Sequence, residues 1–199
     1  MGQFPGEPCD LARVGLSVYM FCPMTKEKLN FGRWVALSAL PLLLAWSLPA
    51  MAQDKALGTY SDWSAQTFSE GGKIVCSMWS QPGKAKGKYR RRGEIYVFVT
   101  HRPTSDQINE LSFEAGYSFK PDSDVSAVVD GETFTLFTKD STAWNRSTEG
   151  DEALVKAMRA GSRMVVKGVS NRGTQTTDTY SLRGFSAAHN AVNTACKIP

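Results

Sequence analysis

Much of the chain consists of short runs in which apolar and polar residues alternate. The run KIVCSMWS places Ile74, Cys76 and Met78 on one face of an extended segment, and EIYVFVTHR is rich in β-branched and aromatic residues. Such alternation is typical of a β-strand with one buried face. Asp130-Gly131 separates two further runs, and this dipeptide favours a tight hairpin. Short strands joined by turns predict an antiparallel fold.

Two segments late in the chain have the pattern of helices. STEGDEALVKAMRAG has acidic residues in its first turn, where the helix dipole favours them, and ends at Gly161. FSAAHNAVNTACK offers Ser186 as its N-cap. Since only these helices interrupt the strands, alternating β–α–β units are disfavoured. We predict a mainly β fold, an antiparallel β-sandwich of immunoglobulin-like or jelly-roll-like type with two short helices late in the chain.

The N-terminal part of the chain predicts export. Residues 24–52 carry basic side chains, then an apolar run broken by Pro41, then the A-x-A site at Ala50 to Ala52. This is the layout of a secretory signal peptide cleaved between Ala52 and Gln53. The alternative is an uncleaved anchor, but the apolar run is shorter than the about 20 residues that a membrane span needs.

Cleavage at this site divides the chain into three parts. We expect no transmembrane span in the mature chain, and we expect it in the periplasm, secreted or at the cell surface. The parts are an upstream extension or mis-called start (1–23), the signal peptide (24–52) and a single β-sandwich domain (53–199).

Two cysteines, Cys76 and Cys196, remain in the mature domain, whereas Cys9 and Cys22 lie upstream. An even pair in an exported protein predicts a Cys76–Cys196 disulfide. Closing a loop of about 120 residues stabilises the fold by roughly 4–5 kcal/mol in the chain-entropy model. The alternative is two separate buried thiols.

The stretch GKAKGKYRRRGE is the most basic part of the chain. If it is extended, alternation places most of its charges on one side, as a docking patch for phosphate-rich lipid, host glycans or nucleic acid. The alternative is a solvated loop whose charges pair with Glu94, Asp106 and Glu110. The net charge of +4 is too mild to predict nucleic acid as the main partner. The residues of this candidate anion-binding patch are Lys84, Lys86, Lys88, Arg90, Arg91 and Arg92.

The mature domain has two histidines, His101 and His189, in none of the spacings that metal sites use. There is no G-x-S-x-G motif around any serine. We therefore predict no catalytic residue, no cofactor and no metal site. The alternative is a periplasmic hydrolase that uses His101 or His189 with a serine, which requires a hydroxyl within ~3 Å of a histidine nitrogen and a carboxylate that orients the histidine.

The segment VVKGVSNRGTQTTDTYSLRGFSAA lacks the glycine spacing of a phosphate-binding loop. It is better described as a strand, a turn and a Thr-rich returning strand. Alternation places Asp178 on the same face as Tyr180 and Leu182, which suit a core. A buried carboxylate needs partners, so we predict that hydroxyls, backbone N–H groups or an arginine hold Asp178 as a buried polar lock.

Five stretches follow one another along the chain: SDWSAQ, VFVTHRP, EAGYSF, AMRAGSRMVVKGVSNRGTQTTDTYSLRGFSAA and the closing AC. Together they resemble the invasion-associated locus B family of exported bacterial proteins. The resemblance implies a secreted, periplasmic or surface-associated β-sandwich of a Gram-negative cell, in a family named for a role in host-cell entry and without established catalytic residues. Many members have a cysteine shortly after the first tryptophan, whereas Trp63 is followed here by SAQTF.

Taken together, the residues and the resemblance predict an exported, non-enzymatic envelope or surface protein that acts by binding, in virulence if the family name applies. Its partner would lie in the envelope or on a host surface. A purely structural envelope factor without a ligand is a further alternative.

Overall fold

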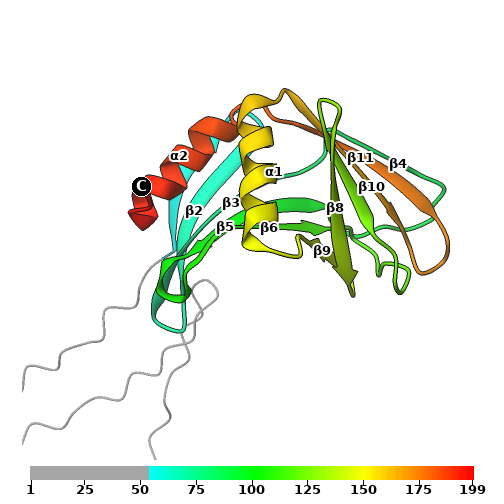
Figure 1. The fold of residues 1–199 in the computed structure, drawn as a ribbon, viewed down its shortest axis with the longest axis horizontal. Helices are drawn as coiled ribbons and strands as arrows, with labels where there is room; N and C mark the ends of the chain where they lie inside the picture. Colours follow the sequence, from blue (N-terminus) through cyan, green and yellow to red (C-terminus); the bar gives the residue numbers. More distant parts are fainter. Residues whose placement is uncertain (1–53) are drawn as a thin grey trace, which may run out of the picture. The chain divides into compact units, whose positions relative to one another are not determined.

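The computed structural model describes residues 54–199. The predicted signal peptide, its cleavage point between Ala52 and Gln53, and residues 1–23 lie outside the described residues. Within 54–199, the strands form one antiparallel sheet with two helices (Figure 1). The prediction of a mainly β, antiparallel fold with two late helices is confirmed.

One half of the sheet contains most of the early strands. It starts at an edge strand and runs inward, each strand antiparallel to its neighbour. In spatial order these strands are β1 (Lys55–Tyr60), β2 (Trp63–Glu70), β3 (Lys73–Ser80), β5 (Tyr96–Arg102), β6 (Gln107–Glu114) and β9 (Thr142–Trp144). A short 3-10 helix, Pro103–Ser105, joins β5 to β6.

The other half continues from β9 without a break. Its last strand, β4, comes early in the sequence but lies at the far edge beside β11 (Figure 1). The chain therefore leaves the first half after β3 and returns to it at β5, which makes residues 88–95 a crossover between the halves. In spatial order the strands are β8 (Glu132–Lys139), β7 (Val125–Val129), β10 (Arg163–Val169), β11 (Gln175–Ser181) and β4 (Lys84–Gly87).

The two halves share a core. The rings of Phe113 on β6 and Tyr180 on β11 lie 6.3 Å apart between centroids. Trp63 is fully buried, and its indole N–H donates to the Ser181 carbonyl oxygen at 3.0 Å. The two layers expected of a sandwich are thus halves of one continuous sheet. Ile74 departs from the predicted buried face and is 47% exposed.

The first helix, α1 (Thr148–Ala160), packs on β6. The Ser147 hydroxyl accepts a hydrogen bond from the Gly150 N–H at 3.3 Å, so this residue caps the helix. Gly161 ends it, as predicted. The buried side of α1 consists of the apolar residues Leu154, Val155 and Met158.

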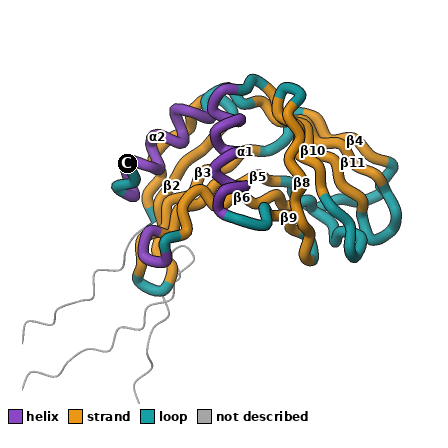
Figure 2. The backbone as a smooth tube through the Cα atoms, in the orientation of Figure 1, coloured by secondary structure: helices purple, strands orange, loops and turns teal. Residues whose placement is uncertain are grey.

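The second helix, α2 (Phe185–Cys196), covers β1, β2 and β3 and lies next to α1 (Figure 2). The predicted N-cap at Ser186 is wrong, because Gly184 occupies that position at φ 91°. A Cβ atom on Gly184 would lie 1.8 Å from the Tyr60 carbonyl oxygen, so only glycine fits there. The Ser186 hydroxyl donates instead to the Arg159 carbonyl oxygen. No helix within 54–199 has the length and apolar character needed to cross a membrane.

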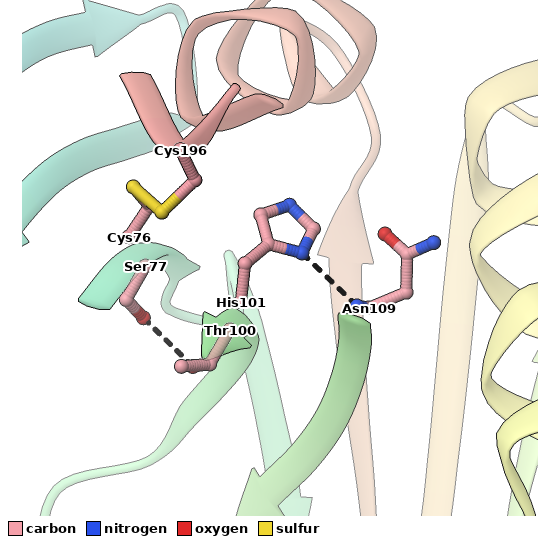
Figure 3. The surroundings of a disulfide bond; sticks show 6 residues. All are labelled: Cys76, Ser77, Thr100, His101, Asn109 and Cys196. Carbon is pink, nitrogen blue, oxygen red and sulfur yellow. Dashed lines mark hydrogen bonds between the residues drawn. A yellow bond between two sulfur atoms is a disulfide. The ribbon is translucent and has the colours of Figure 1, made fainter. Parts of the chain in front are cut away.

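A disulfide joins the last residue of α2 to β3, as predicted. The Cα atoms of Cys76 and Cys196 are 6.0 Å apart, and both residues are buried (Figure 3). The bond closes a segment with a sequence separation of 120 and ties the C-terminal helix to the sheet.

Replacing both cysteines by alanine in the 53–199 domain is expected to lower the free energy of unfolding by about 4 kcal/mol, because the unfolded chain loses its cross-link. Urea denaturation measures this loss. A reductant should shift the midpoint of the parent domain and leave that of the variant unchanged. Equal midpoints for the oxidised parent and the variant would contradict the expected role of the disulfide.

Candidate functional site

A cleft opens where three loops of the chain meet. The crossover after β4 forms one wall, residues 116–118 after β6 form the base, and the turn between β10 and β11 forms the opposite wall. The cleft encloses about 590 Å³. We call it the basic cleft, and it is lined by Lys88, Tyr89, Arg90, Arg91, Arg92, Gly93, Gly116, Tyr117, Ser118, Ser170, Asn171, Arg172, Thr174 and Thr176.

The β10–β11 turn is held in place by its own hydrogen bonds. The Gly173 N–H donates to the Ser170 carbonyl oxygen at 2.8 Å, and the Ser170 hydroxyl accepts from the Thr174 N–H at 3.1 Å. The Asn171 N–H donates to the Ser118 carbonyl oxygen at 2.8 Å, which joins this wall to the base. The wall that carries Arg172 is therefore fixed relative to residues 116–118.

Two glycines bring the crossover against the base. The Gly93 N–H donates to the Gly116 carbonyl oxygen at 2.8 Å, and Gly116 has φ 70°. A Cβ atom on Gly116 would lie 2.4 Å from the Gly93 carbonyl oxygen. Because no side chain fits in that space, glycine at 116 permits the close approach that sets the cleft's shape.

Arg92, which lines the cleft, forms a buried ion pair with Asp178. The Arg92 guanidinium donates to both carboxylate oxygens of Asp178, Nη1 to Oδ1 at 2.7 Å and Nη2 to Oδ2 at 2.6 Å. Its Nε–H donates to the Ala115 carbonyl oxygen at 2.7 Å. The two side chains are 3% and 6% exposed. Strand alternation predicted that Asp178 is buried and held by polar partners. It is indeed buried, and its partner is an arginine, one of the partner types expected for it.

The environment keeps Arg92 charged. Burial lowers the pKa of its guanidinium, but hydrogen bonding and the charge of Asp178 outweigh burial and raise the pKa above its usual range. The guanidinium also lies 4.9 Å from the ring centroid of Tyr117 and 5.5 Å from that of Tyr89. Arg92 is therefore buried and paired, in contrast to the other residues of the candidate anion-binding patch.

The other residues of the predicted patch are exposed. Lys88, Arg90 and Arg91 line the cleft, Lys86 lies just beyond it, and Lys84 stands apart on β4. No ion pair within residues 54–199 involves any of these five, nor Arg172 on the opposite wall.

Arg172 also lines the cleft, although no pattern in the sequence joined it to the patch. The acids expected to neutralise the patch are partly engaged elsewhere. Glu94 accepts a hydrogen bond from Gln81, and Glu110 pairs with Arg102. The cations around the cleft therefore remain free to meet an anion.

Both histidines lie away from this cleft, in a buried network near the disulfide. His101 is fully buried, and its Nδ1 accepts from the Asn109 N–H at 3.0 Å (Figure 3). His189 Nδ1 accepts from Arg159 at 2.6 Å, so its Nε2 carries the proton and donates to Asn109 Oδ1 at 2.8 Å. Burial lowers the pKa of both histidines, that of His189 to about 4 with added repulsion from His101 and Arg159.

The hydrolase alternative required a serine and a carboxylate at one of these histidines. Among residues 54–199, no hydrogen bond joins either histidine ring to a serine hydroxyl or a carboxylate. The nearby Ser77 hydroxyl is hydrogen-bonded to that of Thr100 at 3.0 Å. The same part of the chain holds no group of three or more potential metal ligands. The histidine network instead connects α1 and α2 to the sheet.

Comparisons with known proteins agree with the fold. A family model described as "Invasion associated locus B (IalB) protein" matches residues 63–193. A crystal structure of invasion associated protein B from Bartonella henselae superposes with a TM-score of 0.50 at 20% identity, covering 70% of this chain and 96% of that chain. At this identity the similarity concerns the fold alone. A search among curated proteins gives no match.

The histidine network predicts loss of stability in acid. The pKa of His189 is about 4 in the folded chain and about 6.5 when unfolded, so below pH 6.5 the unfolded state binds more protons. We expect the free energy of unfolding to fall by on the order of 2 kcal/mol between pH 7 and pH 5. Urea titrations at each pH measure this free energy of unfolding. His189→Gln keeps an N–H donor but does not titrate, so an equally steep fall in that variant would contradict the assignment.

Proposed function

Because the chain belongs to the invasion associated locus B family, whose model matches residues 63–193, we propose that it is exported and acts by binding an anionic partner through the basic cleft. It works in the periplasm or at the cell surface and carries out no catalysis. Its partner lies in the bacterial envelope or on a host surface.

The proposal rests on one observation, which is that basic side chains line the cleft and acidic ones do not. Lys88, Arg90, Arg91 and Arg172 line it, and its lining includes no aspartate or glutamate within the described residues. The buried carboxylate of Asp178 is already neutralised by Arg92. Concave surfaces with charges of one sign concentrate the field and attract ions of the opposite sign.

Export is supported by two independent features. Residues 24–52 have the layout of a cleavable secretory signal. Disulfides such as the one between Cys76 and Cys196 form and persist in oxidising compartments, to which a secretory signal directs a protein. A periplasmic hydrolase and a purely structural envelope factor are the alternatives. The exposed cations of the cleft favour binding over a purely structural role, and the hydrogen bonds of the two histidines among residues 54–199 disfavour the hydrolase.

Retention of the 53–199 domain on immobilised heparin tests the proposal. Arg90→Ser/Arg91→Ser removes two cleft charges and spares the buried Arg92, so we expect elution at clearly lower salt because fewer counterions are displaced. Lys73→Ser/Lys139→Ser removes two exposed charges outside the cleft and is the matched control. If both variants elute together, retention reflects net charge alone and the cleft is not the binding surface.

A further inference from the structure

The basic cleft adjoins a further hollow. A second hollow of about 720 Å³ runs along β4 and β11 and shares Lys88, Arg172 and Thr174 with the cleft. Beyond the shared residues it is lined by Lys86, Gln175 and Thr177. Thr176 in the cleft faces the core, whereas Lys86 and its paired neighbour Thr177 point to the other face of β4 and β11. The two hollows therefore meet only at the three shared residues, and we call them together the basic groove.

Cations are spread along the groove rather than gathered at one point. Lys86 lies on β4 and lines the second hollow only, whereas Lys88 follows the end of β4 and lines both hollows. Arg90 and Arg91 follow towards the inner end, and Arg172 stands on the opposite wall. A single small anion can meet only some of these charges, whereas a chain with repeated anionic groups can meet all of them.

Polar groups fill the spaces between the cations. Ser118, Asn171, Thr174 and Gln175 line the groove and are at least partly exposed. Their hydroxyl and amide groups can both donate and accept hydrogen bonds, as the hydroxyl groups of a sugar require. This lining suits a ligand that carries many hydroxyls as well as charges.

The groove is less suited to nucleic acid. Proteins that hold single strands stack successive bases on several aromatic rings. Tyr89 is the only large apolar side chain lining the groove, within 54–199, that is clearly exposed, at 38%. The Tyr117 hydroxyl is engaged with that of Thr176 at 2.6 Å, and its ring covers Arg92.

The groove is also less suited to a bilayer surface. Segments that dock on membranes combine basic side chains with apolar ones that enter the lipid. Here the cations surround a depression that a flat surface cannot fill, and Ile74, the other exposed large apolar residue of the described chain, lies outside the groove.

We infer that the groove binds an extended anionic polysaccharide, with sulfate or carboxylate groups on Lys86, Lys88, Arg90, Arg91 and Arg172. This inference rests on the proposed function and names the partner of the same site. The inner cleft holds the first charged sugars, and the part along β4 and β11 holds those that follow.

Calorimetric titration of the 53–199 domain with heparin-derived oligosaccharides tests the inference. Affinity should rise at least about tenfold from disaccharide to octasaccharide, because the longer chain reaches Lys86. Lys86→Ser should weaken binding of the octasaccharide several-fold and leave the disaccharide unaffected, since Lys86 lines only the outer hollow. Arg172→Ser should weaken both and make the dependence of log K on log salt shallower by about 1.

Lys73→Ser, outside the groove, is the control and should bind both oligosaccharides as the parent does. Single-stranded DNA of matched charge and phosphatidylglycerol vesicles are titrated alongside. Equal affinity for the disaccharide and the octasaccharide, or tighter binding of DNA or vesicles, would overturn the polysaccharide while leaving an anion-binding protein. Absence of binding to every one of these anions would overturn the proposed function as well.

Discussion

The buried pair of Arg92 and Asp178 is the interaction on which the groove depends. Arg92 lies on the crossover between the halves of the sheet, and Asp178 lies on β11. Removing two charges from water costs several kcal/mol for each, so such a pair persists only when its hydrogen bonds are complete. Here both carboxylate oxygens and the Ala115 carbonyl accept from the guanidinium. The crossover is therefore fixed in one position, and the basic residues that precede Arg92 are held around the groove.

The same pair explains why charge remains available above it. The negative charge of Asp178 is already paired with Arg92, so it does not neutralise the cations that line the groove, Arg90, Arg91 and Arg172. Like charges in one depression repel each other, and an anion between them lowers the free energy. At the other end of the molecule, the disulfide and the network around His189 tie α2 to the sheet. These buried polar groups give the fold rigidity, while the solvent-facing groove is left for binding.

Local patterns in the sequence account for most of the fold. Alternation and the Asp130-Gly131 hairpin identified β3, β5, β7, β8, β10 and β11, and acid placement and Gly161 identified α1. The position of Asp178 in the core also followed from register. What the sequence could not provide was its partner, because Arg92 is separated from it by 86 residues. Simple alternation placed Arg92 among the exposed lysines, but β4 ends at Gly87 and the period-two pattern ends with it.

Other failures have the same long-range cause. Gly184 replaces Ser186 as the helix cap because the Tyr60 carbonyl, far away in sequence, leaves no room for a side chain. Arg172 joins the groove only because the β10–β11 turn is hydrogen-bonded to Ser118. Binding sites assembled from several loops are therefore recognised only after the strands are paired.

The most direct measurement of the central claim is the amide NMR spectrum of the 53–199 domain during titration with a sulfated octasaccharide. The account predicts that the largest shifts fall on residues 86–93, Ser118 and 171–175. Shifts centred on the histidine network between α1 and α2, or no shifts at saturating ligand, would contradict it.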